Sequence, residues 1–172
     1  MIQIIKDDFI RYCTYFKIKP TIISFIKMYL LNSCFHSVVL HRIKSSNKTL
    51  YYILRLCTGR GQSCLYILTK KVGKGFMVHH GFATIINAEE IGNNCLIYQQ
   101  VTIGMKGIYK PVIGDNVTII CGAKILGNVK IGNNVIVGSN AVVVKDIPDN
   151  SMVAGIPAKI IKRYNPSTQE WY

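Results

Sequence analysis

Two adjacent histidines, His79 and His80, are the residues of this chain that are best suited to chemistry. They lie in FMVHHGFATII, residues 76–86, between runs of β-branched and aromatic residues. A neutral imidazole can accept a proton near neutral pH or bind a metal ion. Successive side chains on an extended segment point to opposite faces, so we expect that only one of the two imidazoles serves a given site.

The other histidines and the cysteines do not complete a metal site with this pair. A zinc ion of the carbonic-anhydrase kind needs three converging imidazoles, and His36 and His41 lie far from His79 in the sequence. The cysteines show no CxxC spacing. Cysteines without such spacing are typical of small apolar core residues in a reducing cytoplasm. They are Cys13, Cys34, Cys57, Cys64, Cys95 and Cys121. We therefore predict no metal ion and a cytoplasmic location.

The segment around His79 belongs to a region with a period of six residues. This period fits neither an amphipathic helix nor a hairpin meander, but it is typical of a parallel β-helix. Each hexad would supply one short strand and one turn, and three hexads would close a triangular coil. Glycine and asparagine would occupy corners with positive φ. The recurring aliphatic residues are Ile91, Ile97, Ile103, Ile113, Ile119, Ile125, Ile131, Val137 and Val143.

One interruption breaks this period. The interval between Ile103 and Ile113 is ten residues, so GMKGIYKP, residues 104–111, contains a four-residue insertion. We expect this insertion to leave the coil as a loop. Loops that project from a rigid scaffold often carry binding groups, although an inert surface bulge is the alternative.

The first part of the chain has a helical period, as in IIKDDFIRYCTYF and KTLYYILRL. The apolar run at 21–40 is long enough to cross a bilayer. It contains Lys27, Asn32 and His36, so we predict a packed helix rather than a membrane span or a signal peptide. The predicted regions are a short N-terminal helical region at 1–64, a mainly β domain at 65–155 and a C-terminal tail at 156–172.

The positive charge of the chain is concentrated in the helical region. Residues 1–71 carry 12 basic and 2 acidic side chains, within a net charge of +13 for the whole chain. Such a bias favours an anionic partner. The sequence has no GxGxxG, P-loop or groove-reading motif, so we predict no nucleic-acid partner. The charge, together with Tyr51 and Tyr52, favours peripheral contact with the anionic inner face of the cell membrane.

The β region resembles the hexapeptide-repeat acyltransferases. The resemblance rests on a histidine-bearing coil, IYQQVTIG, and repeats that end in DIPDNSMVAGIPAKIIKR. Within this class the chain is similar to the serine acetyltransferases and to their short relatives that O-acetylate bacterial polysaccharides, such as the colanic-acid type. The resemblance implies a left-handed parallel β-helix, a homotrimer with active sites between subunits, and acetyl-CoA as co-substrate.

The resemblance also implies roles for individual residues. His80 matches the general base, which removes a proton from an alcohol as the alcohol attacks a thioester. His79 stands where serine acetyltransferases usually have aspartate, so we expect it either to support the base or to pack. The carboxylate that orients the base in many of these enzymes falls at Leu65, which leaves Glu89 and Glu90 as candidates.

For the acetyl-CoA site the resemblance implies three positions for the pantetheine arm and three cations for the phosphates. The first group is Met105, Cys121 and Ser139, and the second is Lys159, Lys162 and Arg163.

The identity of the acceptor depends on the inserted loop. Where serine acetyltransferases carry an Arg-His pair for the serine carboxylate, this chain has Tyr109 and Lys110. A forked donor is therefore missing, and tyrosine suits the apolar face of a sugar ring. The resemblance also implies a shortened helical region and a tail, QEWY, without the docking isoleucine. We predict O-acetylation of a saccharide or lipid-linked sugar in polysaccharide biosynthesis. The alternatives are a serine O-acetyltransferase and a non-catalytic β-helix assembly module.

Overall fold

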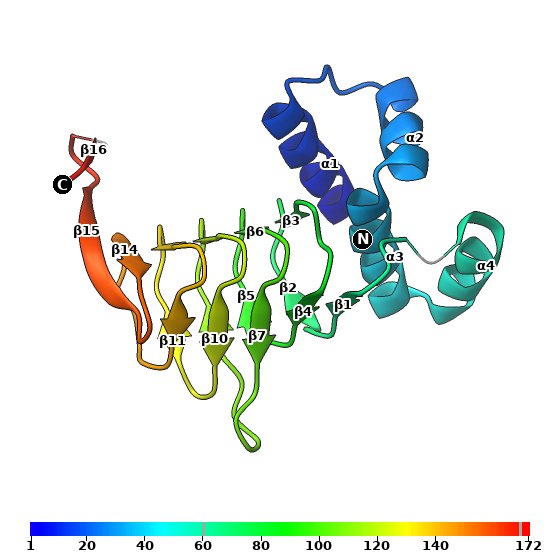
Figure 1. Ribbon diagram of the computed structural model, residues 1–172. Coiled ribbons are helices and arrows are strands. Elements are labelled where there is room, and N and C mark those ends of the chain that lie inside the picture. Colours follow the sequence, from blue (N-terminus) through cyan, green and yellow to red (C-terminus); the bar gives the residue numbers. More distant parts are fainter. Residues whose placement is uncertain (60, 169) are drawn as a thin grey trace.

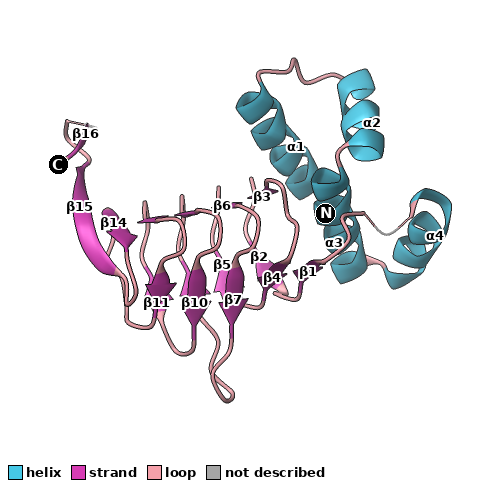
Figure 2. Cartoon of the chain, in the orientation of Figure 1, coloured by secondary structure: helices cyan, strands magenta, loops and turns pink. Residues whose placement is uncertain are grey.

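The computed structural model describes residues 1–59, 61–168 and 170–172. A group of helices is followed by a coil of short strands (Figure 1). Figure 2 shows that the helices lie at one end of the molecule and that the strands lead away from them in successive coils. The helices are α1 (Ile2–Phe16), α2 (Ile22–Leu31), α3 (Ser33–Ser46) and α4 (Lys48–Thr58).

Polar side chains determine where α2, α3 and α4 begin. Thr21 and Ser24 form a capping box at the start of α2. Asn32 and Asn47 cap α3 and α4 by accepting hydrogen bonds from backbone N–H groups. Asn32 therefore divides the apolar run at 21–40 into two helices, α2 and α3, bent by 100°. Within the described residues, no single helix has the length and apolarity to cross a membrane, and this bent pair passes that test only on length and composition.

The strands form three sheets that are the three faces of a coil, which confirms the predicted parallel β-helix. The first sheet contains β1 (Leu65–Ile67), β4 (Thr84–Ile86), β7 (Thr102–Gly104), β10 (Lys124–Leu126) and β13 (Val142–Val143). The second contains β2 (Lys71–Val72), β5 (Glu90–Ile91), β8 (Val112–Ile113) and β11 (Lys130–Ile131). The third contains β3 (Met77–Val78), β6 (Leu96–Ile97), β9 (Thr118–Ile119), β12 (Ile136–Val137) and β14 (Ser151–Ala154), extended by the antiparallel strands β15 (Lys159–Asn165) and β16 (Glu170–Trp171).

The aliphatic residues of the hexads fill the interior of the coil. Ile91, Ile113 and Ile131 pair in register on successive coils, and each is at most 2% exposed. The spacing of Ile91 and Ile113 includes the insertion, so the inserted residues leave the register of the core unchanged. Burial of such a continuous column is the main favourable contribution to a solenoid, because a single coil cannot bury its own apolar residues.

The corners of the coil use asparagine and glycine for different reasons. Four stacked asparagines have φ between 54° and 57° and are linked by side-chain hydrogen bonds; they are Asn94, Asn116, Asn134 and Asn150. The glycine of each IGNN or IGDN motif does not have positive φ, contrary to the prediction. A Cβ at Gly114 would lie 2.8 Å from the carbonyl carbon of Gly132. Close approach of successive coils is therefore what requires glycine there.

Helix α1 covers the open edge of the first coil. Strand β3 is the last strand of its sheet, so the backbone groups on its outer side lack a neighbouring strand. The hydroxyl of Tyr12 accepts a hydrogen bond from the N–H of Val78 (3.0 Å) and donates one to its carbonyl oxygen (2.9 Å). Asp8 accepts a bond from the N–H of Phe76 (2.9 Å) and pairs with Arg42 of α3 (2.8 Å). These contacts attach the helices to the coil immediately before His79.

Candidate active site

His79 and His80 follow β3, but they do not continue its extended conformation. His80 has a φ of 54°, a left-handed conformation that is uncommon outside glycine and asparagine. The ring centroids of the two histidines are 3.9 Å apart with an interplanar angle of 68°. The prediction that the two imidazoles face opposite sides is therefore wrong, because the alternation of side chains holds only for extended backbone.

The two imidazoles have different surroundings. His80 is exposed, whereas His79 is half-buried against Tyr15 and Phe16 of α1 and Tyr98 after β6, with ring centroids 5.0 to 5.7 Å from its own. Burial and then the nearby charge of His80 lower the pKa of His79 below its usual value. His79 is consequently neutral at physiological pH. Its Nδ1 atom is buried and has no hydrogen-bond partner among the described residues.

Hydroxyl groups close one side of this pair. The hydroxyls of Tyr15 and Tyr98 lie 3.1 Å apart and share a hydrogen bond. That hydrogen bond, followed by burial, raises the pKa of Tyr98 to about 12. The backbone N–H of His79 also donates to the carbonyl oxygen of Ile97 (2.9 Å). The ring of His79 is therefore held by both the coil and α1, while the ring of His80 is open to a ligand.

A row of residues on one corner of the coil lies below the turn that contains His80. Because β6, β9 and β12 pair in register, the equivalent positions on successive coils are Gln99, Cys121 and Ser139. The first coil has two more residues at this corner, since Val78 pairs with Ile97 and Ile85 with Thr102, and the N–H of Gln100 donates to the carbonyl oxygen of Phe82. The Sγ of Cys121 donates to the hydroxyl oxygen of Ser139 (3.5 Å). The structure thus brings two of the residues predicted to contact the pantetheine arm, Cys121 and Ser139, together on the corner below the turn of His80.

Gln99 is a candidate site residue that the sequence analysis missed. Its Oε1 is buried without a hydrogen-bond partner among the described residues, and Gln99 precedes Cys121 in the corner row. The position is found by counting back from Cys121 by one coil and the four inserted residues. A buried acceptor without a partner is uncommon.

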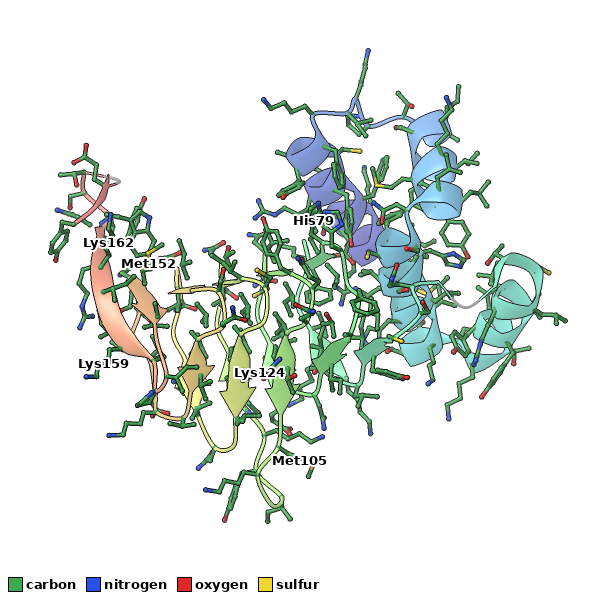
Figure 3. The ribbon with its side chains drawn as sticks, in the orientation of Figure 1. His79, Met105, Lys124, Met152, Lys159 and Lys162 are labelled. Carbon is green, nitrogen blue, oxygen red and sulfur yellow. The ribbon has the colours of Figure 1, made fainter. Side chains whose placement is uncertain are left out.

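The inserted loop lies away from this corner in a single chain. Lys106 and Tyr109 close the loop through backbone hydrogen bonds of 3.0 and 3.3 Å, and Tyr109 and Met105 are exposed. Figure 3 shows Met105 at the edge of the coil opposite to His79. Lys110, half-buried at the end of the loop, belongs to the same edge. One chain therefore does not bring the predicted loop residues together with His80.

The predicted phosphate-binding cations lie on the last long strand. Lys159, Lys162 and Arg163 are exposed on β15, at the end of the coil farthest from the helices (Figure 3). Arg163 also donates to the hydroxyl oxygen of Ser151 (3.2 Å).

The predicted carboxylate partners do not reach His80. Leu65 is half-buried and packs against the apolar core, and Glu89 and Glu90 are exposed near the start of β5 on another face. Across residues 1–59, 61–168 and 170–172, the one ion pair is that of Asp8 and Arg42. The same residues contain no cluster of three His, Cys, Asp or Glu side chains that could hold a metal ion. The site can therefore act as an exposed imidazole base beside a neutral imidazole.

Comparisons with known proteins agree with this arrangement. Residues 110–145 match the family model described as bacterial transferase hexapeptide (six repeats). A serine acetyltransferase of Bacillus pumilus is 32% identical over 169 residues, which cover 92% of this chain and 76% of the relative. The crystal structure of Neisseria gonorrhoeae serine acetyltransferase in complex with serine has a TM-score of 0.72 and 30% identity, covering 92% of this chain and 68% of that one. That of the Brucella abortus enzyme in complex with coenzyme A has a TM-score of 0.71 and 26% identity, covering 95% and 68%.

Proposed function

Because the chain belongs to the serine acetyltransferase family of hexapeptide-repeat acyltransferases, we propose that it transfers the acetyl group of acetyl-CoA to the hydroxyl of L-serine. The observation that carries the proposal is the match to the Bacillus pumilus serine acetyltransferase over 92% of the chain. The solved relatives in complex with serine and with coenzyme A support the two substrates.

The predicted saccharide acceptor is wrong, because the relatives found over nearly the whole chain are serine acetyltransferases. The prediction relied on Tyr109, which removes a forked donor from the loop. The same loop keeps two cations, Lys106 and Lys110, and a lysine can bind a carboxylate as a point charge.

In the proposed reaction His80 is the general base. Its imidazole takes the proton of the serine hydroxyl as the hydroxyl oxygen attacks the thioester carbonyl. An oxygen–carbon bond forms and the carbon–sulfur bond breaks. The proton then passes from His80 to the departing sulfur of CoA. The products are O-acetylserine and the free thiol of CoA, and the base returns to its neutral form.

We propose that the pantetheine arm follows the corner row below His80. Gln99, Cys121 and Ser139 present polar side-chain atoms at successive coils, and the unpartnered Oε1 of Gln99 suits an amide N–H of the arm. The exposed lysines of β15, Lys159 and Lys162, continue in the direction of the phosphates.

We also propose a homotrimer in which the loop of one subunit covers His80 of the next. Two observations support it. The loop lies at the edge opposite to His79 in a single chain (Figure 3), and apolar side chains on the outside of the first coils are exposed, namely Tyr66, Leu68, Phe82 and Ile85. Light scattering tests the mass. Mixing inactive His80→Ala subunits with Lys110→Met subunits would restore activity in a shared site, whereas an active monomer would contradict the proposal.

For the helical region we propose contact with an anionic membrane surface, for which the comparisons provide no support. Ile22, Ile23 and Leu31 of α2 are 81%, 67% and 83% exposed, and Lys19 and Lys27 lie beside them in sequence. An amphipathic surface of this kind binds through apolar burial and attraction to anionic lipids. The same helices enclose an apolar groove of about 790 Å³.

Vesicle co-sedimentation tests this contact. We expect the wild-type chain to sediment with vesicles that contain phosphatidylglycerol and to remain in solution with phosphatidylcholine alone. The double variant Ile22→Ser and Ile23→Ser should lose the binding. Of the two tyrosines named from the sequence, Tyr52 is exposed, whereas Tyr51 is half-buried beside Arg55. Equal sedimentation with both lipids would contradict the proposal.

The decisive experiment for the acceptor is acetyl-CoA consumption with L-serine. We expect saturable release of the CoA thiol and formation of O-acetylserine, detected by mass spectrometry. His80→Ala should lower the rate roughly 100-fold or more, which is the usual effect of losing a general base. Absence of O-acetylserine with the folded wild-type protein would refute serine as the acceptor.

A further inference from the structure

The general base His80 has no carboxylate to orient it in the described part of the chain. No acidic side chain lies within 4.0 Å of its ring nitrogens, since the ion pair of Asp8 and Arg42 is the one found there. The interior beside His80 is also closed to an added group. A Cβ on Gly81 would lie 3.0 Å from the side chain of Leu65 and 2.8 Å from that of Val78. A base without an orienting partner can rotate and exchange its two tautomers, which lowers its efficiency.

The group in contact with His80 is the imidazole of His79, with ring centroids 3.9 Å apart. Its Nδ1 is a buried nitrogen without a hydrogen-bond partner in the described residues, and burial keeps the ring neutral. A neutral imidazole has one nitrogen that accepts hydrogen bonds. With the ring proton on Nε2, Nδ1 is a buried acceptor, which costs about 1–3 kcal/mol to leave unsatisfied. This tautomer therefore favours a donor that arrives when the site is occupied.

The ring of His79 is also held in place more firmly than that of His80. Tyr15 and Phe16 of α1 and Tyr98 of the coil surround it, and Tyr15 and Tyr98 are hydrogen-bonded to each other. The side chain of His80 is exposed and can turn toward its neighbour. Catalytic hydrogen bonds that are absent without substrate often form in the substrate complex.

We propose that His79 is the positioning residue of His80: its Nδ1 accepts the ring N–H of His80, so that the other ring nitrogen of His80 faces the acceptor hydroxyl as a lone pair. The inference rests on the proposed function for the identity of the acceptor. When His80 has taken the proton of the hydroxyl, it carries two N–H groups. One remains bonded to His79, and the other returns its proton to the sulfur of CoA.

The chemistry of substituted side chains distinguishes this role from packing. Asparagine places an amide oxygen where histidine has Nδ1, glutamine places its amide near the position of Nε2, and phenylalanine keeps the ring without a nitrogen. We expect His79→Phe and His79→Gln to lower kcat about tenfold or more. We expect His79→Asn to stay within about threefold of the wild-type kcat, and KM for acetyl-CoA to stay within about twofold in all three. His41→Asn, on α3 and outside the site, is the matched control.

Two readouts do not depend on serine. The first is His80-dependent hydrolysis of acetyl-CoA without an acceptor, which should follow the same order of variants. The second is the tautomer of the His80 ring in long-range proton–nitrogen NMR spectra of protein with labelled histidine. With the protein saturated by CoA, we expect one tautomer in the wild type and in His79→Asn, and a mixture in His79→Phe. Circular dichroism verifies that each variant is folded.

These readouts separate the inference from the proposed function. Hydrolysis or an ordered tautomer without O-acetylserine formation would refute serine as acceptor and leave the role of His79 supported. A His79→Phe variant with wild-type kcat, or with one unchanged His80 tautomer, would overturn the inference. So would a His79→Asn variant as impaired as His79→Phe.

Discussion

The hydroxyl of Tyr12 offers a sharp test of how the helices support the site. Tyr12 is fully buried, and its hydroxyl bonds to both the N–H and the carbonyl oxygen of Val78. Tyr12→Phe keeps the ring but leaves two buried backbone groups on the edge of β3 without partners. An unsatisfied buried group costs about 1–3 kcal/mol, so we expect the variant to lose about 2–4 kcal/mol of its free energy of unfolding.

Urea denaturation at a fixed protein concentration measures this loss, because oligomers unfold in a concentration-dependent way. The melting temperature should fall by roughly 5–10 °C. The turnover number should fall as well, since Val78 directly precedes His79. Tyr52→Phe, at an exposed position of α4, is the control and should stay within about 0.5 kcal/mol of the wild type. A Tyr12→Phe variant as stable as this control would refute the argument that Tyr12 replaces a neighbouring strand.

Three further predictions concern charged groups. Asp8→Asn should lower the free energy of unfolding by about 3–5 kcal/mol, because Arg42 is left buried and unpaired. In denaturation experiments the double variant Asp8→Asn and Arg42→Met should lose less free energy of unfolding than the sum of the two single variants. Burial, followed by the charges of Arg42 and Lys44, lowers the pKa of His41 to about 4. Between pH 6.5 and 4 the unfolded chain therefore binds more protons than the folded chain, so the free energy of unfolding should fall by at most about 3 kcal/mol as the pH falls through that window. Denaturation at several pH values should show a flatter pH dependence for His41→Gln. Changing Lys159 and Lys162 to glutamine should raise KM for acetyl-CoA about threefold or more in steady-state kinetics, with kcat unchanged.

The coil could be predicted from the sequence because each of its requirements is local. An inward aliphatic residue is needed at every sixth position whatever the rest of the chain does, and Ile91 and Ile113 keep that register through the insertion. The glycines of the corners were also located correctly, but for the wrong reason. Their neighbours across the coil, such as Gly132 opposite Gly114, are visible only once the coils are stacked.

The geometry of the histidine pair could not be predicted in the same way. The left-handed conformation of His80 depends on the turn around Gly81, whose N–H donates to Cys34 of α3 at 3.2 Å. Tyr12 contacts a backbone 66 residues away. Helical periodicity predicts that such residues are buried but not which strand edge they cover. The acceptor prediction failed because it gave the loss of a forked donor at Tyr109 more weight than the point charge of Lys110 beside it.

The contacts of α1 argue that the helical region helps to build the proposed active site. Asp8 and Tyr12 supply the hydrogen bonds that a preceding coil would otherwise give to β3. One turn further along the same helix face, Tyr15 and Phe16 pack against His79. A shift of α1 would therefore change both the hydrogen bonds at the edge of the first coil and the packing around His79. One helix suffices for this purpose, because α1 closes the coil and packs against the neutral histidine beside His80.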